Sequence, residues 1–376
     1  MKIGFDAKRL FHNFTGLGNY SRTLVSNLAA LFPENIYHLF TPSVSDQSRT
    51  KSYLSNPQFH IHTPDSGRFL WRTWRMNRDL RKTGIDLYHG LSHELPLNIK
   101  PPSGYKTIVT IHDLIFRLFP HHYALPDRKI YDLKCAYSCR NADHIIAISE
   151  QTKRDIIRYY NIASEKISVI YQSCDPMFYE IASVQTRQEI LRKYQLPSEY
   201  ILCVGSVTER KNLLTIIQAI RQMNDKNRVP LVVIGEGGSY KRKVLKYISE
   251  NRLDKWVIFV PNLYYPDLPA IYQAAQIFVY PSLYEGFGIP VIEALISKTP
   301  VITSNTSSLP EAAGPDSICI DPLNTELFTF HIQNILQDSN LGNQMREKGV
   351  LYSERFHFSE VTKLVMQLYR ATTGMD

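Results

Sequence analysis

Two carboxylates flank a glycine-rich loop in the second half of the chain, and together they could bind a ligand. Glu285 precedes the loop, Glu293 lies beyond it, and Pro290 between them suits the first turn of a helix. Backbone amides at a helix N-terminus bind phosphate, and carboxylates accept hydrogen bonds from hydroxyl groups. This arrangement favours an elongated ligand with a central diphosphate and hydroxyl-rich rings at either end, as in a nucleotide sugar. The alternative is an ordinary turn between a strand and a helix, with both glutamates on the surface.

Two adjacent cations, Arg210 and Lys211, form the second group that could meet a phosphate. They lie in a loop between a predicted strand at 200–205 and a predicted helix at 213–220. Positive side chains at such a junction can neutralise a diphosphate and stabilise it as a leaving group. A solvated basic loop would have the same sequence, so that alternative stays open.

The first half of the chain has two further candidate features. Gly16 and Gly18 lie in a loop between the first predicted strand and a predicted helix that ends near Phe32. His112 follows the apolar run 108–111, which places it at the carboxyl end of a strand, where doubly wound α/β domains bind ligands. An ordinary glycine turn and a structural histidine are the alternatives. No role is assigned to His89, His93, His121 or His122.

The elements that must position these side chains alternate between strands and helices along the chain. That order predicts an α/β fold with parallel sheets. One of its helices is expected from Glu150 to about Tyr160, with Ser149 as its N-cap. The pattern starts again at 200–205, and a chain of 376 residues is longer than one typical domain. We therefore expect two domains, with a boundary within 172–195.

Composition argues against several classes of protein. No apolar run approaches the roughly 20 residues that span a bilayer, and Met1 begins a predicted strand rather than a signal peptide. Five cysteines without a CxxC pair predict neither a disulfide framework nor a structural metal site. The expected location is the cytoplasm.

Positive charge is concentrated in the first half of the chain. The net charge is +8, and residues 1–180 hold nearly all of this excess. The excess suggests an acidic partner such as an anionic lipid or a diphosphate-linked acceptor. Residues 68–82 are the most basic stretch, and they combine arginines with Trp71 and Trp74 in a predicted amphipathic helix. Such a helix can lie on an anionic membrane surface, which for a cytoplasmic protein is the inner face of the membrane. A packed helix with one solvated charged side is the alternative.

Residues 280–294 resemble the donor-site signature of the family 4 glycosyltransferases, which have the GT-B fold. The signature positions found here are Pro281, Ser282, Glu285, Gly286, Phe287, Gly288, Pro290, Glu293 and Ala294. The resemblance implies two Rossmann-like doubly wound domains that face each other across a cleft. They would be an acceptor-side domain at 1–180 and a donor domain at 195–355, with a C-terminal helix at 356–376 that returns to the first domain.

The same resemblance implies roles for the candidate residues. Glu285 would bind hydroxyls of the donor sugar, Glu293 would bind the ribose hydroxyls, and His112 would approach the donor sugar. Arg210 and Lys211 would neutralise the diphosphate, without a metal or a cofactor. The residues of the donor-facing loops would be Gly286, Phe287 and Gly288 in the second domain and Gly16 and Gly18 in the first.

The expected activity is that of a retaining glycosyltransferase that moves a sugar from a nucleotide diphosphate donor to a hydroxyl of a saccharide or lipid-linked acceptor. The run Arg210-Lys211-Asn212 resembles that of many mannosyltransferases, so GDP-mannose is the expected donor. We expect no nucleic-acid partner. One rival is a nucleotide-sugar-binding protein that has lost catalysis. Another is a glycoside hydrolase in which Glu285 and Glu293 flank the scissile bond, but it would leave the two cations without a purpose.

Overall fold

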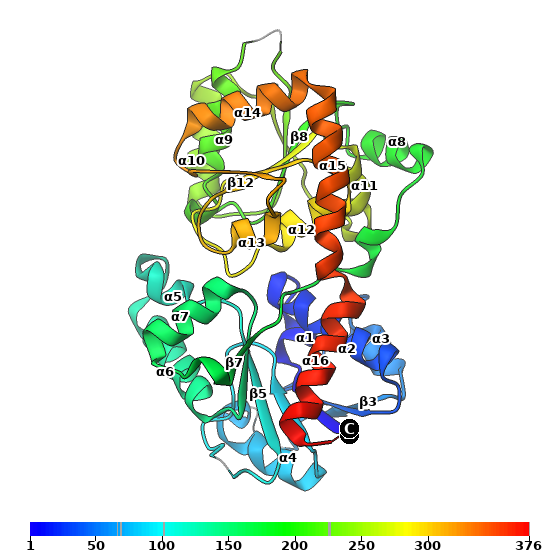
Figure 1. Cartoon of the computed structure of the whole chain (residues 1–376), viewed down its shortest axis with the longest axis vertical. Helices are drawn as coiled ribbons and strands as arrows, with labels where there is room; N and C mark the ends of the chain where they lie inside the picture. Colours follow the sequence, from blue (N-terminus) through cyan, green and yellow to red (C-terminus); the bar gives the residue numbers. More distant parts are fainter. Residues whose placement is uncertain (66, 68–69, 101, 225–226, 376) are drawn as a thin grey trace. The chain divides into compact units, whose positions relative to one another are not determined.

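The computed structural model describes residues 1–65, 67, 70–100, 102–224 and 227–375 and divides into two compact units (Figure 1). Unit 1 comprises Met1–Ser173 and His357–Asp376, and unit 2 comprises Cys174–Phe356. The division between residues 173 and 174 falls within the expected boundary of 172–195, although the units extend to slightly different limits from the expected 1–180, 195–355 and 356–376. Unit 1 is discontinuous, because the chain leaves it, builds unit 2 and then returns.

Unit 1 is built on a parallel sheet with the strand order β3-β2-β1-β4-β5-β6-β7. Its strands are β1 (Lys2–Asp6), β2 (Ile36–Phe40), β3 (Phe59–His62), β4 (Leu87–Gly90), β5 (Lys106–Ile111), β6 (His144–Ala147) and β7 (Ile167–Val169). Most of the central strands are short apolar runs, as expected of parallel strands that are covered on both faces. From β1 the chain first adds β2 and β3 on one side of the sheet and then adds β4 to β7 on the other side, which is the topology of a doubly wound domain.

Helices cover both faces of this sheet. They are α1 (Lys8–His12), α2 (Gly16–Leu31), α3 (Lys51–Ser55), α4 (Met76–Thr83), α5 (Ile115–Leu118), α6 (Leu125–Asn141), α7 (Glu150–Tyr160) and α16 (Phe358–Thr373). Successive strand residues point to opposite faces, so two cores form. Ile108 packs in the core shared with α2 and α16, whereas Val109 packs in the core shared with α4, α6 and α7. The Tyr369 hydroxyl of α16 lies 2.5 Å from Nδ1 of the buried His89 on β4.

Unit 2 repeats this architecture with the strand order β10-β9-β8-β11-β12-β13, again parallel. Its strands are β8 (Ile201–Val204), β9 (Leu231–Ile234), β10 (Val257–Phe259), β11 (Ile277–Tyr280), β12 (Val301–Ser304) and β13 (Ile318–Ile320). Its helices are α8 (Val184–Lys193), α9 (Leu213–Gln222), α10 (Ser239–Glu250), α11 (Leu268–Ala274), α12 (Ile289–Ile296), α13 (Leu309–Ala313), α14 (Thr325–Gln337) and α15 (Ser339–Ser353). The predicted α/β class and the Rossmann-like topology are confirmed in both units.

The basic stretch 68–82 differs from the expected amphipathic helix. Arg68 and Phe69 lie outside the described residues, Trp71–Arg75 form a π-helical turn, and α4 follows. Arg72 does not lie on a solvated face, because its guanidinium is 2.5 Å from Asp6 and 2.5 Å from Glu94. Ion pairs with these two carboxylates, which come from other parts of the sequence, hold the Arg72 side chain away from solvent.

Candidate active site

The loop after β11 holds Glu285, and its shape depends on a glycine. Gly288 has a φ of +135°, a conformation that residues with a side chain rarely adopt. A Cβ atom there would lie 3.1 Å from Ala312 Cβ and 3.1 Å from Leu309 Cδ2. Helix α12 begins at the next residue, with Pro290 in its first turn as expected. The backbone is therefore held closely where the loop enters the helix.

Glu285 is the centre of a buried ion cluster. Its Oε1 lies 2.5 Å from Lys211 Nζ and 2.9 Å from Arg210 Nη1. Ser282 Oγ donates to the same oxygen at 2.5 Å, and the Glu285 amide donates to Ser307 Oγ at 3.0 Å. The fold thus brings together three of the side chains for which the sequence predicts a catalytic role.

The charges in this cluster depend on one another. Burial alone would raise the pKa of Glu285, but Lys211 and Arg210 outweigh that effect and hold the pKa below its ordinary value. Burial lowers the pKa of Lys211, an effect that the charge of Glu285 opposes. A phosphate that approached these cations would compete with the Glu285 carboxylate for them.

Tyr280 is a neighbour of this cluster that the sequence did not identify as a site residue. Lys211 Nζ donates to the Tyr280 hydroxyl and lies 4.8 Å from the centroid of its ring. The hydroxyl itself donates to Glu285 Oε1 at 3.3 Å. The apolar run 277–280 predicted a strand, but nothing in it indicates that its last residue holds the lysine in place.

Glu293 has a different environment from Glu285. It is buried in α12, and the Tyr272 hydroxyl donates to its Oε2 at 2.9 Å. Burial raises the pKa of Glu293 to about 7. Two carboxylates of one loop and helix therefore have opposite pKa shifts, because Glu285 has cationic neighbours and Glu293 has none among the groups that shift its pKa.

The Phe287 side chain has a packing role. Its ring is buried, and its centroid lies 5.4 Å from that of Phe356 at an interplanar angle of 75°. What Phe287 can offer to a donor is therefore its backbone, as for Gly286 and Gly288. The donor contacts expected of these loop residues stay predictions.

Gly16 and Gly18, which were predicted to lie in a loop, are in the first turn of α2, and Asn13 holds the segment that leads into this helix. The Asn13 Oδ1 accepts hydrogen bonds from the amides of Thr15, at 2.9 Å, and of Gly18, at 3.2 Å. A Cβ atom on Gly18 would lie 1.7 Å from the Asn13 carbonyl oxygen, whereas one on Gly16 would meet nothing within 4 Å. A glycine is therefore needed at position 18, where the Asn13 backbone approaches closely, whereas position 16 has space for a side chain. The expected diphosphate contact of both glycines stays a prediction.

His112 is buried, with both ring nitrogens engaged inside unit 1. Nε2 lies 2.9 Å from the Leu91 carbonyl oxygen, to which it donates, and Nδ1 accepts from the Gln172 amide at 2.9 Å. Burial, with a smaller contribution from His93, lowers the pKa of His112 to about 3. His112 is therefore neutral at physiological pH. Its expected role near the donor sugar stays a prediction.

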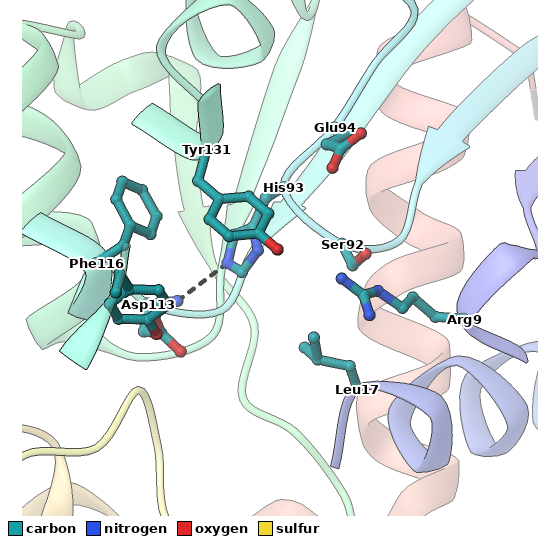
Figure 2. Close-up of a pocket in the computed structure, with 9 residues that line it drawn as sticks. Arg9, Leu17, Ser92, His93, Glu94, Asp113, Phe116 and Tyr131 are labelled. Atoms are coloured by element: carbon teal, nitrogen blue, oxygen red, sulfur yellow. Dashed lines mark hydrogen bonds between the residues drawn. The ribbon is translucent and has the colours of Figure 1, made fainter. Parts of the chain in front are cut away.

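A cavity of about 190 Å³ lies beside this segment of unit 1 (Figure 2). It is lined by Arg9, Leu17, Ser92, His93, Glu94, Asp113, Phe116, Tyr123 and Tyr131. His112 is not among these lining residues, but the neighbouring Asp113 is. His93 had no predicted role, and nothing in the sequence connects Arg9 with the loop that carries His93.

The described part of the chain shows no group of three or more His, Cys, Asp or Glu side chains that could hold a metal ion. The cysteines Cys135, Cys139, Cys174, Cys203 and Cys319 are free thiols. None of the described helices is both long enough and apolar enough to span a membrane.

Two family models match the chain, one in each half. Residues 186–351 match "Glycosyl transferases group 1", and residues 14–177 match "Glycosyltransferase Family 4". Among curated proteins, the chain is 27% identical over 389 residues to O-antigen chain mannosyltransferase B of Escherichia coli, an alignment that covers 98% of this chain and 100% of that protein. It is 26% identical over 258 residues to O-antigen chain mannosyltransferase RfbU of Salmonella typhimurium, covering 68% of this chain and 67% of that protein.

Solved structures share the same fold over almost the whole chain. Anabaena Alr3699/HepE in complex with UDP superposes with a TM-score of 0.78 at 15% identity, covering 99% of this chain and 100% of that one. WaaG, a glycosyltransferase involved in lipopolysaccharide biosynthesis, superposes with a TM-score of 0.72 at 16% identity and covers 100% of both chains.

Proposed function

The chain belongs to the family 4 glycosyltransferases and is a glycosyltransferase of the GT-B fold, and we propose that it transfers mannose from GDP-mannose to a hydroxyl group of a growing surface polysaccharide. The observation that carries this proposal is the buried cluster of Glu285 with Arg210 and Lys211. Two cations at one carboxylate, beside a glycine loop and a helix N-terminus, suit a donor that carries both phosphates and hydroxyl groups.

The chemistry that we propose is an electrostatic stabilisation of the leaving group. As the bond between the sugar C1 and the diphosphate oxygen breaks, Arg210 and Lys211 stabilise the charge that develops on the diphosphate. The acceptor hydroxyl oxygen forms a bond to C1 on the same face, and its proton leaves with the diphosphate. Glu285 accepts hydrogen bonds from donor sugar hydroxyls, and Glu293 accepts them from the ribose. His112 helps to place the donor sugar.

The choice of mannose and of a polysaccharide rests on the relatives. The two O-antigen chain mannosyltransferases named above are similar to this chain over most of its length. The Escherichia coli serotype-specific mannosyltransferase WbdA is also similar, at 29% identity over 297 residues, although the alignment covers only 36% of that longer protein. The run Arg210-Lys211-Asn212 supports the same donor.

The donor is tested first by thermal unfolding of the purified protein with UDP, GDP, ADP and dTDP. We expect GDP to raise the melting temperature more than the other nucleotides do, because ligands that bind only the folded state stabilise it. Release of GDP from GDP-mannose, with a mannose-containing oligosaccharide as acceptor and a chelator present, then measures turnover. A shift by another nucleotide alone would overturn the choice of donor, and no shift by any of them would overturn the nucleotide site.

The acceptor is proposed to be a lipid-linked saccharide, reached by binding of unit 1 to an anionic membrane surface. Leu70 and Trp74 are 50% and 48% exposed, and the side chain of Arg78, which follows in the same basic stretch, is 69% exposed. Aromatic and apolar side chains next to exposed cations suit the interface of an anionic bilayer. Co-sedimentation with vesicles that contain phosphatidylglycerol, at low salt, tests this proposal. No binding of the protein to the vesicles would overturn it.

A further inference from the structure

The cavity in unit 1 brings together side chains from segments that are far apart in the sequence (Figure 2). Arg9 comes from α1, His93 and Glu94 come from the loop after β4, Asp113 follows β5, and Tyr131 lies on α6. In Figure 2, Arg9 and Glu94 lie on one side and the aromatic rings of Phe116 and Tyr131 on the other. The volume of about 190 Å³ is smaller than the roughly 300–1,000 Å³ of sites for drug-sized ligands. It suits one small ring rather than an extended chain.

Arg9 supplies an unpaired cation to this cavity. Within the described residues, its guanidinium has no hydrogen bond and no ion pair, and its Nε is buried without a partner. A buried donor without an acceptor destabilises the folded state. Figure 2 shows the guanidinium directed toward the cavity. A ligand that accepted hydrogen bonds from Arg9 would remove this destabilisation.

His93 supplies a second donor, and the backbone fixes which nitrogen carries the proton. Its φ is +61°, in the left-handed region, and its Nε2 accepts from the amides of His112 at 2.9 Å and of Asp113 at 3.3 Å. Burial lowers the pKa of His93 to about 4, so the ring is neutral at physiological pH and its proton is on Nδ1. This Nδ1–H group has no acceptor among the residues that the structure describes.

Glu94 supplies a carboxylate oxygen whose charge is already balanced. Its Oε2 lies 2.5 Å from Arg72 and 3.2 Å from Lys134, and these cations outweigh the effect of burial and hold its pKa below the ordinary value. Its Oε1 receives no hydrogen bond from the described part of the chain. Asp113 adds a second carboxylate, with Oδ1 accepting from the Ile115 amide at 3.0 Å. The cavity therefore offers acceptors as well as donors.

Aromatic rings form the opposite wall. The Tyr131 ring lies 6.4 Å from Phe116 and 6.3 Å from Tyr123, centroid to centroid, and its side chain is 41% exposed. The flat apolar face of a ring can cover the C–H groups of a sugar, while polar groups on the other side take its hydroxyls. A phosphate would also meet Arg9, but it would then lie beside the carboxylates of Glu94 and Asp113, which repel it.

We infer that this cavity binds one neutral hexopyranose ring of the acceptor, with its hydroxyls on Arg9, His93 and Glu94 and one face on Tyr131. This inference rests on the proposed function, because it names the part of the acceptor that unit 1 recognises. The donors and acceptors present in the cavity match the hydroxyl groups of a sugar, which can both donate and accept.

The experiment measures binding of sugars to the full chain by saturation-transfer NMR. The probes are methyl α-D-mannopyranoside, the methyl glycosides of glucose, galactose and N-acetylglucosamine, and mannose 6-phosphate as the anionic comparison. Arg9→Met and Tyr131→Ala remove the two walls of the cavity. Lys129→Met and Ile130→Ala are matched controls, since both residues are exposed on α6 and do not line the cavity. Glu285→Gln reports whether a sugar is bound in unit 2 instead.

We expect at least one neutral methyl glycoside to bind at millimolar concentration. Arg9→Met should weaken this binding by about tenfold, and Tyr131→Ala should weaken it severalfold. The two α6 controls and Glu285→Gln should leave it unchanged. All of these cavity variants should keep the wild-type thermal shift with GDP, which shows that they fold and that the donor site is intact.

Three results would overturn the inference. These are no binding of any neutral glycoside, binding that Arg9→Met and Tyr131→Ala leave unchanged, or tighter binding of mannose 6-phosphate than of the neutral glycosides. Failure of the proposed function has a different signature. In that case no nucleotide would shift the melting temperature, whatever the sugars do.

Discussion

Replacement of Glu285 by glutamine would test the buried ion cluster most directly. The substitution keeps the size of the side chain and an oxygen for the Ser282 hydroxyl, but it removes the negative charge shared by Lys211 and Arg210. The Glu285, Lys211 and Arg210 side chains are only 11%, 15% and 18% exposed, so water cannot fully replace the lost partner. Breaking a buried pair of this kind costs about 3–5 kcal/mol, and the retained hydrogen bond from Ser282 places Glu285→Gln near the lower limit.

This loss can be measured as a change in melting temperature. For a domain of the size of unit 2, each kcal/mol corresponds to about 2–4 °C, so the unfolding of unit 2 should shift down by about 6–12 °C. GDP carries phosphates but no mannose, and it can supply the missing negative charge to Lys211 and Arg210. GDP should therefore raise the melting temperature of Glu285→Gln by more than it raises that of the wild type, while transfer of the sugar is lost.

The matched control is Glu236→Gln. Glu236 lies 2.8 Å from Lys241, but its side chain is 77% exposed, and such pairs contribute only about 0–1 kcal/mol. If Glu285→Gln melted as close to the wild type as this control does, the cluster would not have the energetic role that we assign to it. An equal effect of GDP on variant and wild type would contradict competition between Glu285 and phosphate. Unchanged turnover would contradict the role of Glu285 in the reaction.

Three further predictions concern stability. Burial raises the pKa of Glu293 from 4.5 to about 7, so the free energy of unfolding should fall as the pH rises through this interval, by up to about 1.4 kcal/mol per pH unit, and should level off above it. In denaturant titrations at several pH values, Glu293→Gln should lack this fall. The same pH dependence in the variant and the wild type would contradict the raised pKa. Gly18→Ala should lower the melting temperature of unit 1 because its Cβ would overlap the Asn13 carbonyl, whereas Gly16→Ala should not. Equal melting temperatures of the two variants would show that the backbone at Asn13 moves to make room. Arg72→Met should lower the free energy of unfolding by about 3–5 kcal/mol because it leaves Asp6 and Glu94 without their shared cation. Trp74→Ala should leave the melting temperature near the wild-type value and weaken sedimentation with anionic vesicles. If Trp74→Ala destabilised the protein and Arg72→Met instead weakened sedimentation, Arg72 would be a surface residue after all.

Features that depend on neighbours in the chain could be predicted from the sequence. Ser149 was predicted as an N-cap, and the Thr152 amide donates to its hydroxyl at 3.0 Å at the start of α7, which ends at Tyr160 as expected. Pro290 was predicted in the first turn of a helix, which is where α12 has it. Alternation of strands and helices was sufficient to predict the α/β class, because each such element follows local rules of periodicity and capping.

Contacts between distant parts of the chain could not be predicted in this way. Lys211 and Glu285 are 74 positions apart, and they meet because β8 and β11 are neighbours in the sheet, an order that the sequence does not state. The inward turn of Arg72 depends on Asp6 and Glu94 in the same manner. His93 was missed because its position depends on a left-handed backbone conformation, which is rare for residues other than glycine.

The return of α16 to unit 1 makes the order of synthesis differ from the order of folding. A ribosome makes residues 174–356 after the strands of unit 1 and before α16. During that time, the core face of unit 1 lacks the side chains that complete it, which are Val361, Val365, Met366 and Tyr369. Unit 2 is continuous in the sequence, so its core can form completely before α16 packs on unit 1. The unit that emerges first is therefore completed last, and its open apolar face is the surface that chaperones would have to protect during translation.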